Sequence, residues 1–545
     1  MMKGFFTTKA IKVGGILLLA LFLIASAVAF LKTGTGSVSE RQSTTRQPVV
    51  SRPVSSESPN ILFILTDDQD LASLAYMPKL QKYLVNEGTS FSNYFDNYAL
   101  CCVARASILR GQNANNTHVK GNQLPNGGFE KFQQLGVNGE QETIGVWLKN
   151  WGYTTSFIGK YLNGYGKGED KATSKNHVPP GWDDWRAIFT QEVYDYEMNE
   201  NGKVVTYGKA PEDFKTDVLA DKTVSFLEKR TSADSPFFMY LAPTAPHAPA
   251  TPAPRHAGMF ANLKVPRTGA FDEADVSDKA LWVREQGPLS EKKIAELDEK
   301  YRKRLGSLQA VDDMIERIIQ TLEKTGELDN TYIVFTSDNG FHLGQHRLDA
   351  GKQTIYEEDI HLPLIVRGPG VAKGKVVNDI VGNIDLAPTF SELAGGAPMS
   401  VDSDGRSFAG LLSESFPAPS APRNGYLIGF GVDDFISKAP KASKGDKTKT
   451  KTSDDDVLNE DGDFLLGANA LKKGYIGVRT RNYMYAEFLN GDKELYDLRK
   501  DPMELSNMYR SANPDLIASI QAMLAKLRTC AGESCRQAEQ MPIKE

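Results

Sequence analysis

The sequence predicts an α/β fold, in which a large sheet is covered by helices on both faces and is followed by a smaller C-terminal α+β subdomain. Between residues 59 and 415, apolar runs of strand length alternate with amphipathic helical segments. After about residue 415, short strand-like segments replace this alternation. A chain of 545 residues with 40% hydrophobic content is long enough to form both cores.

The elements of the main domain have distinct local signatures. Asn60–Thr66 is a continuous apolar run of the kind found in buried strands. Ser290–Lys324 predicts a long helix, because its apolar residues recur on one stripe from Leu305 to Leu322. The other predicted elements are a helix at Thr143–Asn150 and strands at Thr154–Ile158, Pro236–Ala242 and Thr331–Ser337.

The C-terminal part has a different character. We predict antiparallel strands at Gly425–Gly431, Gly474–Thr480 and Tyr483–Leu489, and a closing helix at Pro514–Arg528. Residues 437–463 form a low-complexity insertion of lysines followed by acids, which predicts a solvated loop. The predicted boundaries are 59–415 for the main domain, 416–535 for the subdomain and 536–545 for a tail.

Residues 1–32 have the pattern of an export segment. Three lysines precede an uncharged run from Val13 to Leu31, and small residues lie near its end. The run is also nearly long enough to span a bilayer. We therefore expect either a signal peptide, giving a secreted protein, or an anchor on the outer face of the cytoplasmic membrane. Residues 33–58 are predicted to be a flexible linker.

Charge and cysteine content narrow the class of protein. A net charge of −6 argues against a nucleic-acid-binding protein, which needs a basic face. Four cysteines are too few for disulfides to hold an exported fold of this size. Cys530 and Cys535 flank a short loop and can form a local disulfide. Cys101 and Cys102 are adjacent and a poor disulfide pair.

Oxygen-bearing side chains follow two predicted strands that lie far apart in the sequence. Asp67 and Asp68 come directly after Asn60–Thr66, and Asp338 and Asn339 follow the strand at Thr331–Ser337. If these strands are neighbours, the four side chains meet at the carboxyl edge of the sheet. Such a set suits a hard cation, Ca²⁺ or Mg²⁺. The alternative is that each pair caps the turn that follows it.

The segment Leu100–Gly111 places Cys101 four residues before Arg105, at the start of a predicted helix. A helix N-terminus and a nearby cation both favour an anionic sulfur or oxygen. The structural alternative is a buried cysteine pair beside a surface arginine.

Together, these motifs resemble those of the sulfatases of the alkaline phosphatase superfamily. The resemblance covers about Pro59 to Asn507 and implies a large mixed β-sheet sandwiched by helices. It is strongest toward the glucosamine-6-sulfatases and the extracellular heparan endosulfatases. The residues that carry it are Thr66-Asp67-Asp68-Gln69, Cys101-Cys102-Val103-Ala104-Arg105, Gly159-Lys160-Tyr161-Leu162-Asn163, Pro179-Pro180-Gly181-Trp182, Ala245-Pro246-His247, Ser337-Asp338-Asn339-Gly340, His342-Leu343-Gly344-Gln345, Leu495-Tyr496-Asp497-Leu498 and Asp501-Pro502.

The resemblance implies that a formylglycine-generating enzyme converts Cys101 to formylglycine, an aldehyde that hydrates to a diol. One hydroxyl of the diol would attack the sulfur of a sulfate ester and release the alcohol. The second hydroxyl would then expel sulfate and restore the aldehyde. The implied substrate is a sulfated carbohydrate or another organic sulfate ester.

The resemblance also implies roles for individual residues. Arg105 would orient the diol, Lys160 would contact the diol or the sulfate, and His247 would protonate the leaving alcohol. The proposed cation ligands are Asp67, Asp68, Asp338, Asn339 and the modified Cys101. The proposed substrate contacts are Lys352, His118 and His342. For His247, Lys352 and His118, a purely structural role is the alternative.

The chain departs from the common sulfatase pattern in two places. Val103 occupies a position where many sulfatases have Pro or Ala, and Leu162 occupies one where many have His. The second departure leaves the base for the second hydroxyl unassigned. Two alternative functions stay open: a phosphate mono- or diester hydrolase on the same scaffold, and a catalytically silent glycan-binding protein if Cys101 stays a thiol.

Overall fold

The computed structural model describes residues 54–55, 57–135, 139–230, 235–419, 421–431 and 473–545. The predicted export segment 1–32, most of the linker 33–58 and the insertion 437–463 lie outside this part of the chain. Within it, no helix is both long and apolar enough to cross a bilayer.

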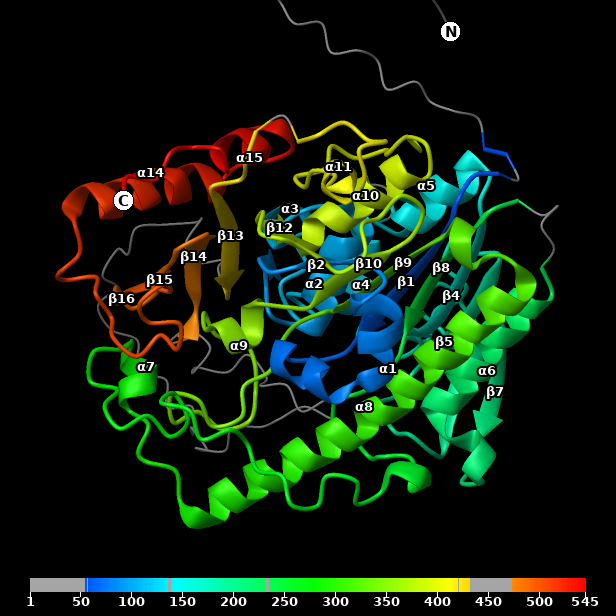
Figure 1. The fold of residues 1–545 in the computed structure, drawn as a ribbon, viewed down its shortest axis with the longest axis horizontal. Coiled ribbons are helices and arrows are strands. Elements are labelled where there is room, and N and C mark those ends of the chain that lie inside the picture. The colour runs from blue at the N-terminus through cyan, green and yellow to red at the C-terminus, as the bar shows by residue number, and fades with distance from the viewer. Residues whose placement is uncertain (1–53, 56, 136–138, 231–234, 420, 432–472) are drawn as a thin grey trace, which may run out of the picture. The chain divides into compact units, whose positions relative to one another are not determined.

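A ten-stranded mixed sheet forms the centre of the fold, in the order β11-β2-β10-β9-β1-β8-β4-β5-β6-β7 (Figure 1). Its middle is a parallel group of β9 (Thr331–Ser337), β1 (Asn60–Thr66), β8 (Phe237–Ala242) and β4 (Thr154–Lys160). These four strands match the four that the sequence predicts. Because Thr66 pairs with Ser337, β1 and β9 end at the same level.

The outer strands were not predicted, because they are short or irregular. On the β9 side lie β10 (Leu364–Arg367), β2 (Thr89–Phe91) and β11 (Lys375–Val377). On the β4 side lie β5 (Asp184–Ile188), β6 (Tyr196–Glu200) and β7 (Lys203–Tyr207). A separate two-stranded pair joins β3 (Tyr94–Phe95) and β12 (Val381–Gly382).

Helices cover both faces of the sheet, as the sequence predicts. Alternate residues of β1 enter two different cores: Phe63 belongs to one and Leu62 to the other. The first core is shared with α2 (Cys101–Arg110), α5 (Ile144–Trp151) and α10 (Leu386–Leu393). The second is shared with α6 (Lys215–Glu228) and α8 (Glu291–Thr325).

The long helix α8 forms where its apolar stripe predicts it. Its N-cap residue, Ser290, accepts a hydrogen bond from the backbone N–H of Lys293, and its C-cap is Gly326 in the left-handed region at φ 75°. Leu308 is buried in the core beneath the sheet, and Leu305 is buried in a separate cluster with Leu297 and Leu343. These caps explain why the observed helix begins and ends one residue later than the predicted Ser290–Lys324.

The C-terminal part forms its own antiparallel sheet of β13 (Gly425–Phe430), β14 (Tyr475–Thr480), β15 (Tyr483–Phe488) and β16 (Lys493–Asp497). The predicted closing helix is α14 (Pro514–Leu527), and the Cys530–Cys535 disulfide is present. The segment 536–545, for which the sequence predicts a tail, is partly packed: α15 (Glu533–Ala538) enters it and Glu539 is buried.

The remaining elements are short. The α-helices are α1 (Pro78–Leu80), α3 (Ala114–Thr117), α4 (Gly128–Gln133), α7 (Leu281–Arg284), α9 (Glu357–Ile360) and α11 (Ala409–Leu412). Single 3₁₀ turns cover Leu71–Tyr76, Gly139–Gln141, Pro211–Asp213, Pro254–His256, Leu328–Asn330 and Asn383–Asp385, and a π turn covers Gln81–Val85.

Candidate active site

The two predicted acid pairs meet at the carboxyl edge of the sheet. The backbone N–H of Asp68 donates to Asp338 Oδ1 at 3.1 Å, and Asn339 Nδ2 donates to Asp68 Oδ1 at 2.7 Å. All four side chains, Asp67 included, are buried. This convergence follows from the parallel pairing of β1 and β9, since both strands end at this edge.

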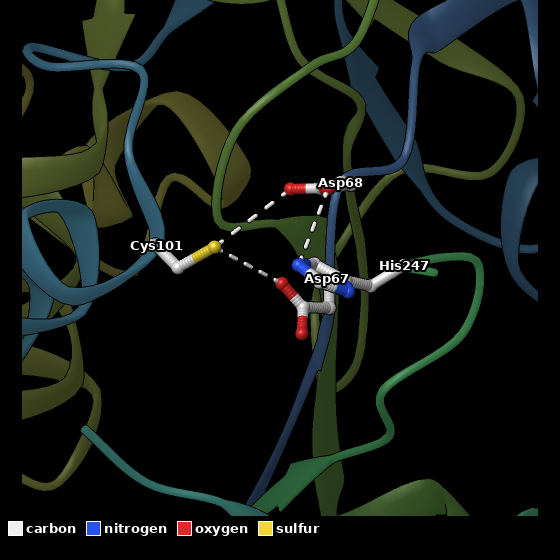
Figure 2. Close-up of side chains that lie close together, drawn as sticks. All are labelled: Asp67, Asp68, Cys101 and His247. Atoms are coloured by element: carbon white, nitrogen blue, oxygen red, sulfur yellow. Dashed lines mark hydrogen bonds and ion pairs between the residues drawn. The ribbon is translucent and has the colours of Figure 1, made fainter. Parts of the chain in front are cut away.

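Cys101 lies at the N-terminus of α2, facing these carboxylates (Figure 2). Its Sγ is 3.4 Å from Asp67 Oδ1 and 3.8 Å from Asp68 Oδ1. Lys352 Nζ donates to Cys101 Sγ at 2.8 Å and to Asp68 Oδ1 at 2.5 Å. Burial raises the pKa of the Cys101 thiol well above its ordinary value. An unmodified Cys101 is therefore uncharged at neutral pH and a poor nucleophile.

Arg105 lies one helical turn after Cys101 and joins three strand ends. Its Nε donates to Asp338 Oδ2 at 2.8 Å, and its Nη1 donates to the backbone carbonyl of Lys160 at 2.7 Å. Its Nη2 is buried, lies 3.8 Å from Asp67 Oδ1 and has no hydrogen-bond partner among the described residues. The guanidinium therefore keeps one donor for an anion at this edge.

Lys160 is the last residue of β4, and its Nζ donates to Asp67 Oδ2 at 2.7 Å. The residue before it must be glycine. Gly159 has φ 120°, and a Cβ there would lie 2.1 Å from the carbonyl oxygen of Ala242 on β8. The close approach of these strands thus positions the Lys160 side chain beside the acid cluster.

His247 follows β8 and reaches the same cluster. Its Nδ1 shares a hydrogen bond with the carbonyl of Ala248 at 2.8 Å, which puts the proton of the neutral ring on Nδ1. Its Nε2 is 3.7 Å from Asp68 Oδ2, is buried and has no hydrogen-bond partner. This nitrogen is therefore available to a ligand.

A cavity of about 740 Å³ opens over the cluster, and Asp68, His247, His342 and Lys352 are among its lining residues. His342 is held by Asp359, whose two carboxylate oxygens lie 2.9 and 3.0 Å from His342 Nδ1. The cavity thus brings together most of the residues for which the sequence predicts substrate contacts. His118 lies elsewhere: it is exposed, ends α3 and does not line this cavity. Its proposed substrate contact stays a prediction.

The charges around the acid pairs determine their ionisation. Burial by itself would raise the pKa of Asp67, but Lys160, His247 and Arg105 hold it well below its usual value. Burial also acts to raise the pKa of Asp68, but Lys352 and His247 together outweigh it and lower this pKa. Burial and the charge of Asp67 raise the pKa of Asp338 to about 6. All three carboxylates are therefore mainly ionised at neutral pH.

The donor set fits a bound hard cation. Asn339 Oδ1 is buried without a hydrogen-bond partner, as expected of a cation ligand. Asp67, Asp68, Cys101 and His247 each offer one ligand atom, and these atoms lie within 4.8 Å of one another. Apart from one sulfur and one imidazole, the donors around this point are carboxylate and amide oxygens, which Ca²⁺ and Mg²⁺ prefer. His247 was not among the predicted ligands.

Sequence reasoning missed two residues at this edge. Arg304 of α8 donates from Nη2 to the carbonyl of Asp68 at 2.5 Å and lines the cavity. The sequence marks Arg304 as unusual, because this charged residue lies four residues before Leu308 on the apolar stripe of α8. The structure shows that it is buried there. Gln191 Nε2 lies 3.5 Å from Asp67 Oδ2. It comes from a loop after β5, and no motif marks it.

The family model and the curated relatives that this chain matches agree on one family. The sulfatase family model matches residues 59–397. The chain is 35% identical over 496 residues to an N-acetylglucosamine-6-sulfatase of Capra hircus, covering 88% of this chain and 85% of that protein. It is 33% identical over 522 residues to an arylsulfatase of Volvox carteri, covering 88% and 76%. A solved structure described as a complex with its substrate D-glucosamine-2-N,6-O-disulfate superposes with a TM-score of 0.69 at 25% identity, covering 89% of this chain and all of that one.

Proposed function

The chain belongs to the sulfatase family and is a sulfuric ester hydrolase, and on that premise we propose that it removes 6-O-sulfate from glucosamine-type sugars and also accepts aryl sulfates. The N-acetylglucosamine-6-sulfatase and the glucosamine disulfate complex support the sugar substrate. The arylsulfatase supports the aryl substrate.

The observation that carries the proposal is the position of Cys101. Its side chain lies at a helix N-terminus, within reach of Asp67, Asp68 and Lys352, and the last two of these residues line the cavity. A buried thiol of raised pKa is a poor nucleophile in this position. Formylglycine made from Cys101 would instead supply a hydroxyl oxygen as the nucleophile.

We propose that a divalent cation, Ca²⁺ or Mg²⁺, is held here and supplies positive charge for the sulfate oxygens. Its ligands would be Asp67, Asp68, Asp338, Asn339 and the modified Cys101. The three carboxylates are matched by three cationic side chains, Arg105, Lys160 and Lys352. Adding a divalent cation therefore leaves the site positive, as binding of a sulfate monoester requires.

The remaining residues take roles around the substrate. Lys352 would bind the sulfate as a point charge, and the free Nη2 of Arg105 would stabilise the attacking oxygen. His247 would protonate the departing sugar oxygen from Nε2 when the ring is an imidazolium with both nitrogens protonated; among the described residues this nitrogen has no hydrogen-bond partner. His342, oriented by Asp359, would contact the sugar, and His118 would do so from further away.

We further propose that the segment 1–32 exports the chain, that 59–415 is the catalytic domain and that 416–535 is a supporting subdomain. Maturation would then require a formylglycine-generating enzyme that accepts Val103 in the motif. The oxidation of a thiol to an aldehyde needs an external oxidant, which that enzyme would use.

Mass spectrometry of the tryptic peptide 83–105 tests the central step. We expect a mass decrease at Cys101 and loss of its alkylation by iodoacetamide, with Cys102 in the same peptide still alkylated. The adjacent thiol is thus an internal control. If both cysteines are alkylated in the exported protein, Cys101 stays a thiol, and the catalytically silent glycan-binding protein becomes the better hypothesis.

Substrate choice tests the reaction. The purified protein should release sulfate from 4-nitrophenyl sulfate and from N-acetylglucosamine 6-sulfate, and should hydrolyse 4-nitrophenyl phosphate more slowly. A preference for the phosphate would favour the alternative of a phosphate ester hydrolase on this scaffold. Loss of both activities in a chelator, with recovery in Ca²⁺ or Mg²⁺, is expected for the cation.

A further inference from the structure

Arg304 contacts three active-site segments that come from three different strands. Its Nη2 donates to the carbonyl of Asp68, after β1, at 2.5 Å. Its Nη1 donates to the carbonyl of Pro246, after β8, at 3.3 Å. Its guanidinium also lies 4.1 Å from the ring centroid of Phe341, after β9. One buried side chain of α8 thus holds the ends of the three central strands.

Two of these contacts lie next to residues with proposed catalytic roles. Asp68 has φ 64°, a left-handed conformation that is uncommon outside glycine and has to be held by its surroundings. The Arg304 bond to the Asp68 carbonyl is one restraint on this residue. Pro246 directly precedes His247, so the second bond restrains the turn that carries the proposed proton donor.

The chemistry of arginine suits this arrangement better than that of any other cation. A planar guanidinium can donate in two directions at once, whereas a lysine ammonium on a flexible stem acts as a point charge. The only carboxylate paired with Arg304 among the described residues is Asp70, at 3.4 Å. Two of its three polar contacts are therefore with backbone carbonyls, which fixes backbone rather than neutralising charge.

We infer that Arg304 is a positioning residue that couples the cation ligand Asp68 to the proton donor His247. In this role it acts through the two backbone carbonyls and not on the sulfate itself. The inference rests on the proposed functions of Asp68 and His247. It predicts that loss of Arg304 damages cation binding and proton donation together.

Arg304→Ala tests the coupling with two measurements. The dissociation constant for Ca²⁺, measured by titration calorimetry, should rise at least about tenfold, as is usual when a group that orients a metal ligand is lost. At saturating Ca²⁺, kcat for N-acetylglucosamine 6-sulfate should fall at least about tenfold more than kcat for 4-nitrophenyl sulfate. Nitrophenolate leaves without a proton, so it depends less on His247.

Arg302→Ala is the matched control. Arg302 lies on the same helix, and its Nη1 donates to one backbone carbonyl, that of Leu263, at 3.1 Å, away from the acid cluster. Both measurements should stay within about twofold of the unmodified protein in this variant. If Arg304→Ala does not fold, Arg304→Lys carries the same test, because one ammonium does not replace the two-directional fork.

The two measurements distinguish failure of the Arg304 coupling from failure of the proposed sulfatase function. An equal loss of kcat for both substrates, or an unchanged affinity for Ca²⁺, overturns the coupling and leaves Arg304 a structural residue. If the unmodified protein hydrolyses no sulfate ester, the proposed function fails, and the proton-donation half of the inference fails with it. The Ca²⁺ titration then still shows separately whether Arg304 supports the binding of a cation at Asp68.

Discussion

Two buried clusters of this protein contain the same kinds of charged residue and are put to different uses. One is the active edge, where Arg105 meets Asp67 and Asp338. The other joins the C-terminal part to the turn at Asn383–Asp385, before α10, where Arg423 meets Asp385 and Glu539. Each arginine is about 1% exposed in its side chain, so burial and charge do not distinguish the clusters.

The difference lies in what remains unpaired. All three side-chain nitrogens of Arg423 donate to carboxylates. Nη1 and Nη2 donate to Asp385 at 2.5 and 2.8 Å, and Nε donates to Glu539 at 2.9 Å. Its cluster also has leftover atoms, Glu539 Oε1 and Arg406 Nε. At the active edge, the leftover atoms are Arg105 Nη2, Asn339 Oδ1 and His247 Nε2, and all three residues contact Asp67 or Asp68.

The active edge differs from the Arg423 cluster because its unpaired atoms gather around one point beside a cavity. Asp68 and His247 line the large cavity, whereas Arg423 and Asp385 do not. The Arg423 cluster, in which the arginine is fully paired, contributes to stability, because removing one partner leaves a buried charge unpaired. At the active edge, the unpaired donor and acceptor atoms can instead bind a charged substrate or a cation.

The largest expected effect is a loss of activity when Cys101, the precursor of the nucleophile at the active edge, is replaced. Cys101→Ala should lower kcat/KM for 4-nitrophenyl sulfate by at least about 10⁴-fold, because it removes the precursor of the attacking group. Cys102→Ala removes an equally buried sulfur one residue away and should keep activity within about tenfold. Equal loss in both variants would mean that the site depends on packing around α2 and not on Cys101 chemistry.

The next largest expected effect is a loss of stability when Arg423 is removed from its carboxylate partners. Arg423→Met should lower the free energy of unfolding by about 3–5 kcal/mol, because Asp385 and Glu539 lose their shared partner while buried. Urea unfolding followed by circular dichroism measures this change. Below the unfolding transition, kcat should stay within about twofold. A large loss of kcat in the folded variant would contradict the assignment of this cluster to stability.

The same substitution at the active edge should have the opposite pattern. Arg105→Met should lower kcat by roughly 10²–10³-fold, as loss of a donor aimed at developing charge does. Its effect on unfolding should be smaller than that of Arg423→Met. The reason is that Asp338, with a pKa of about 6, can take up a proton when its partner is removed. The paired unfolding curves of the two variants decide this point.

Lys215 is a third buried charge, and within the described part of the chain no carboxylate forms an ion pair with it. Lys215 is fully buried, and its Nζ donates to the carbonyl of Thr190 at 3.0 Å. Burial lowers its pKa from 10.5 to about 7. Lys215→Met should therefore raise the free energy of unfolding by roughly 2–4 kcal/mol at pH 7, after loss of the hydrogen bond is deducted.

The pH dependence of this gain follows from proton linkage. Between about pH 7 and 10.5, the unfolded chain binds a proton at Lys215 that the folded chain does not, so rising pH favours folding of the unmodified protein. The advantage of methionine should be full below pH 7 and absent above about pH 10.5. Urea unfolding of both proteins across this range measures it. A gain that does not change with pH would show that Lys215 is not neutralised by burial.

The amino-acid sequence alone was sufficient for the central elements and the family. The strands β1 and β9 follow from continuous apolar runs, and α8 follows from its stripe and from Ser290 as its cap. Short-range patterns determine such elements, because strand and helix periodicities are local properties. The Cys101 motif and the two strand-end acid pairs are also local, so the candidate site could be predicted from them.

Other features depend on contacts that local patterns do not encode. Lys352 reaches Cys101 from a position 251 residues further along the chain, and Arg304 reaches Asp68 from 236 residues away. The Cys101 motif marks Arg105 in the sequence, but no local pattern shows that Arg423 is fully paired and that Arg105 is not. Only the tertiary structure decides which polar atoms are paired in the interior and which are left for a ligand, because pairing depends on the packing of distant segments.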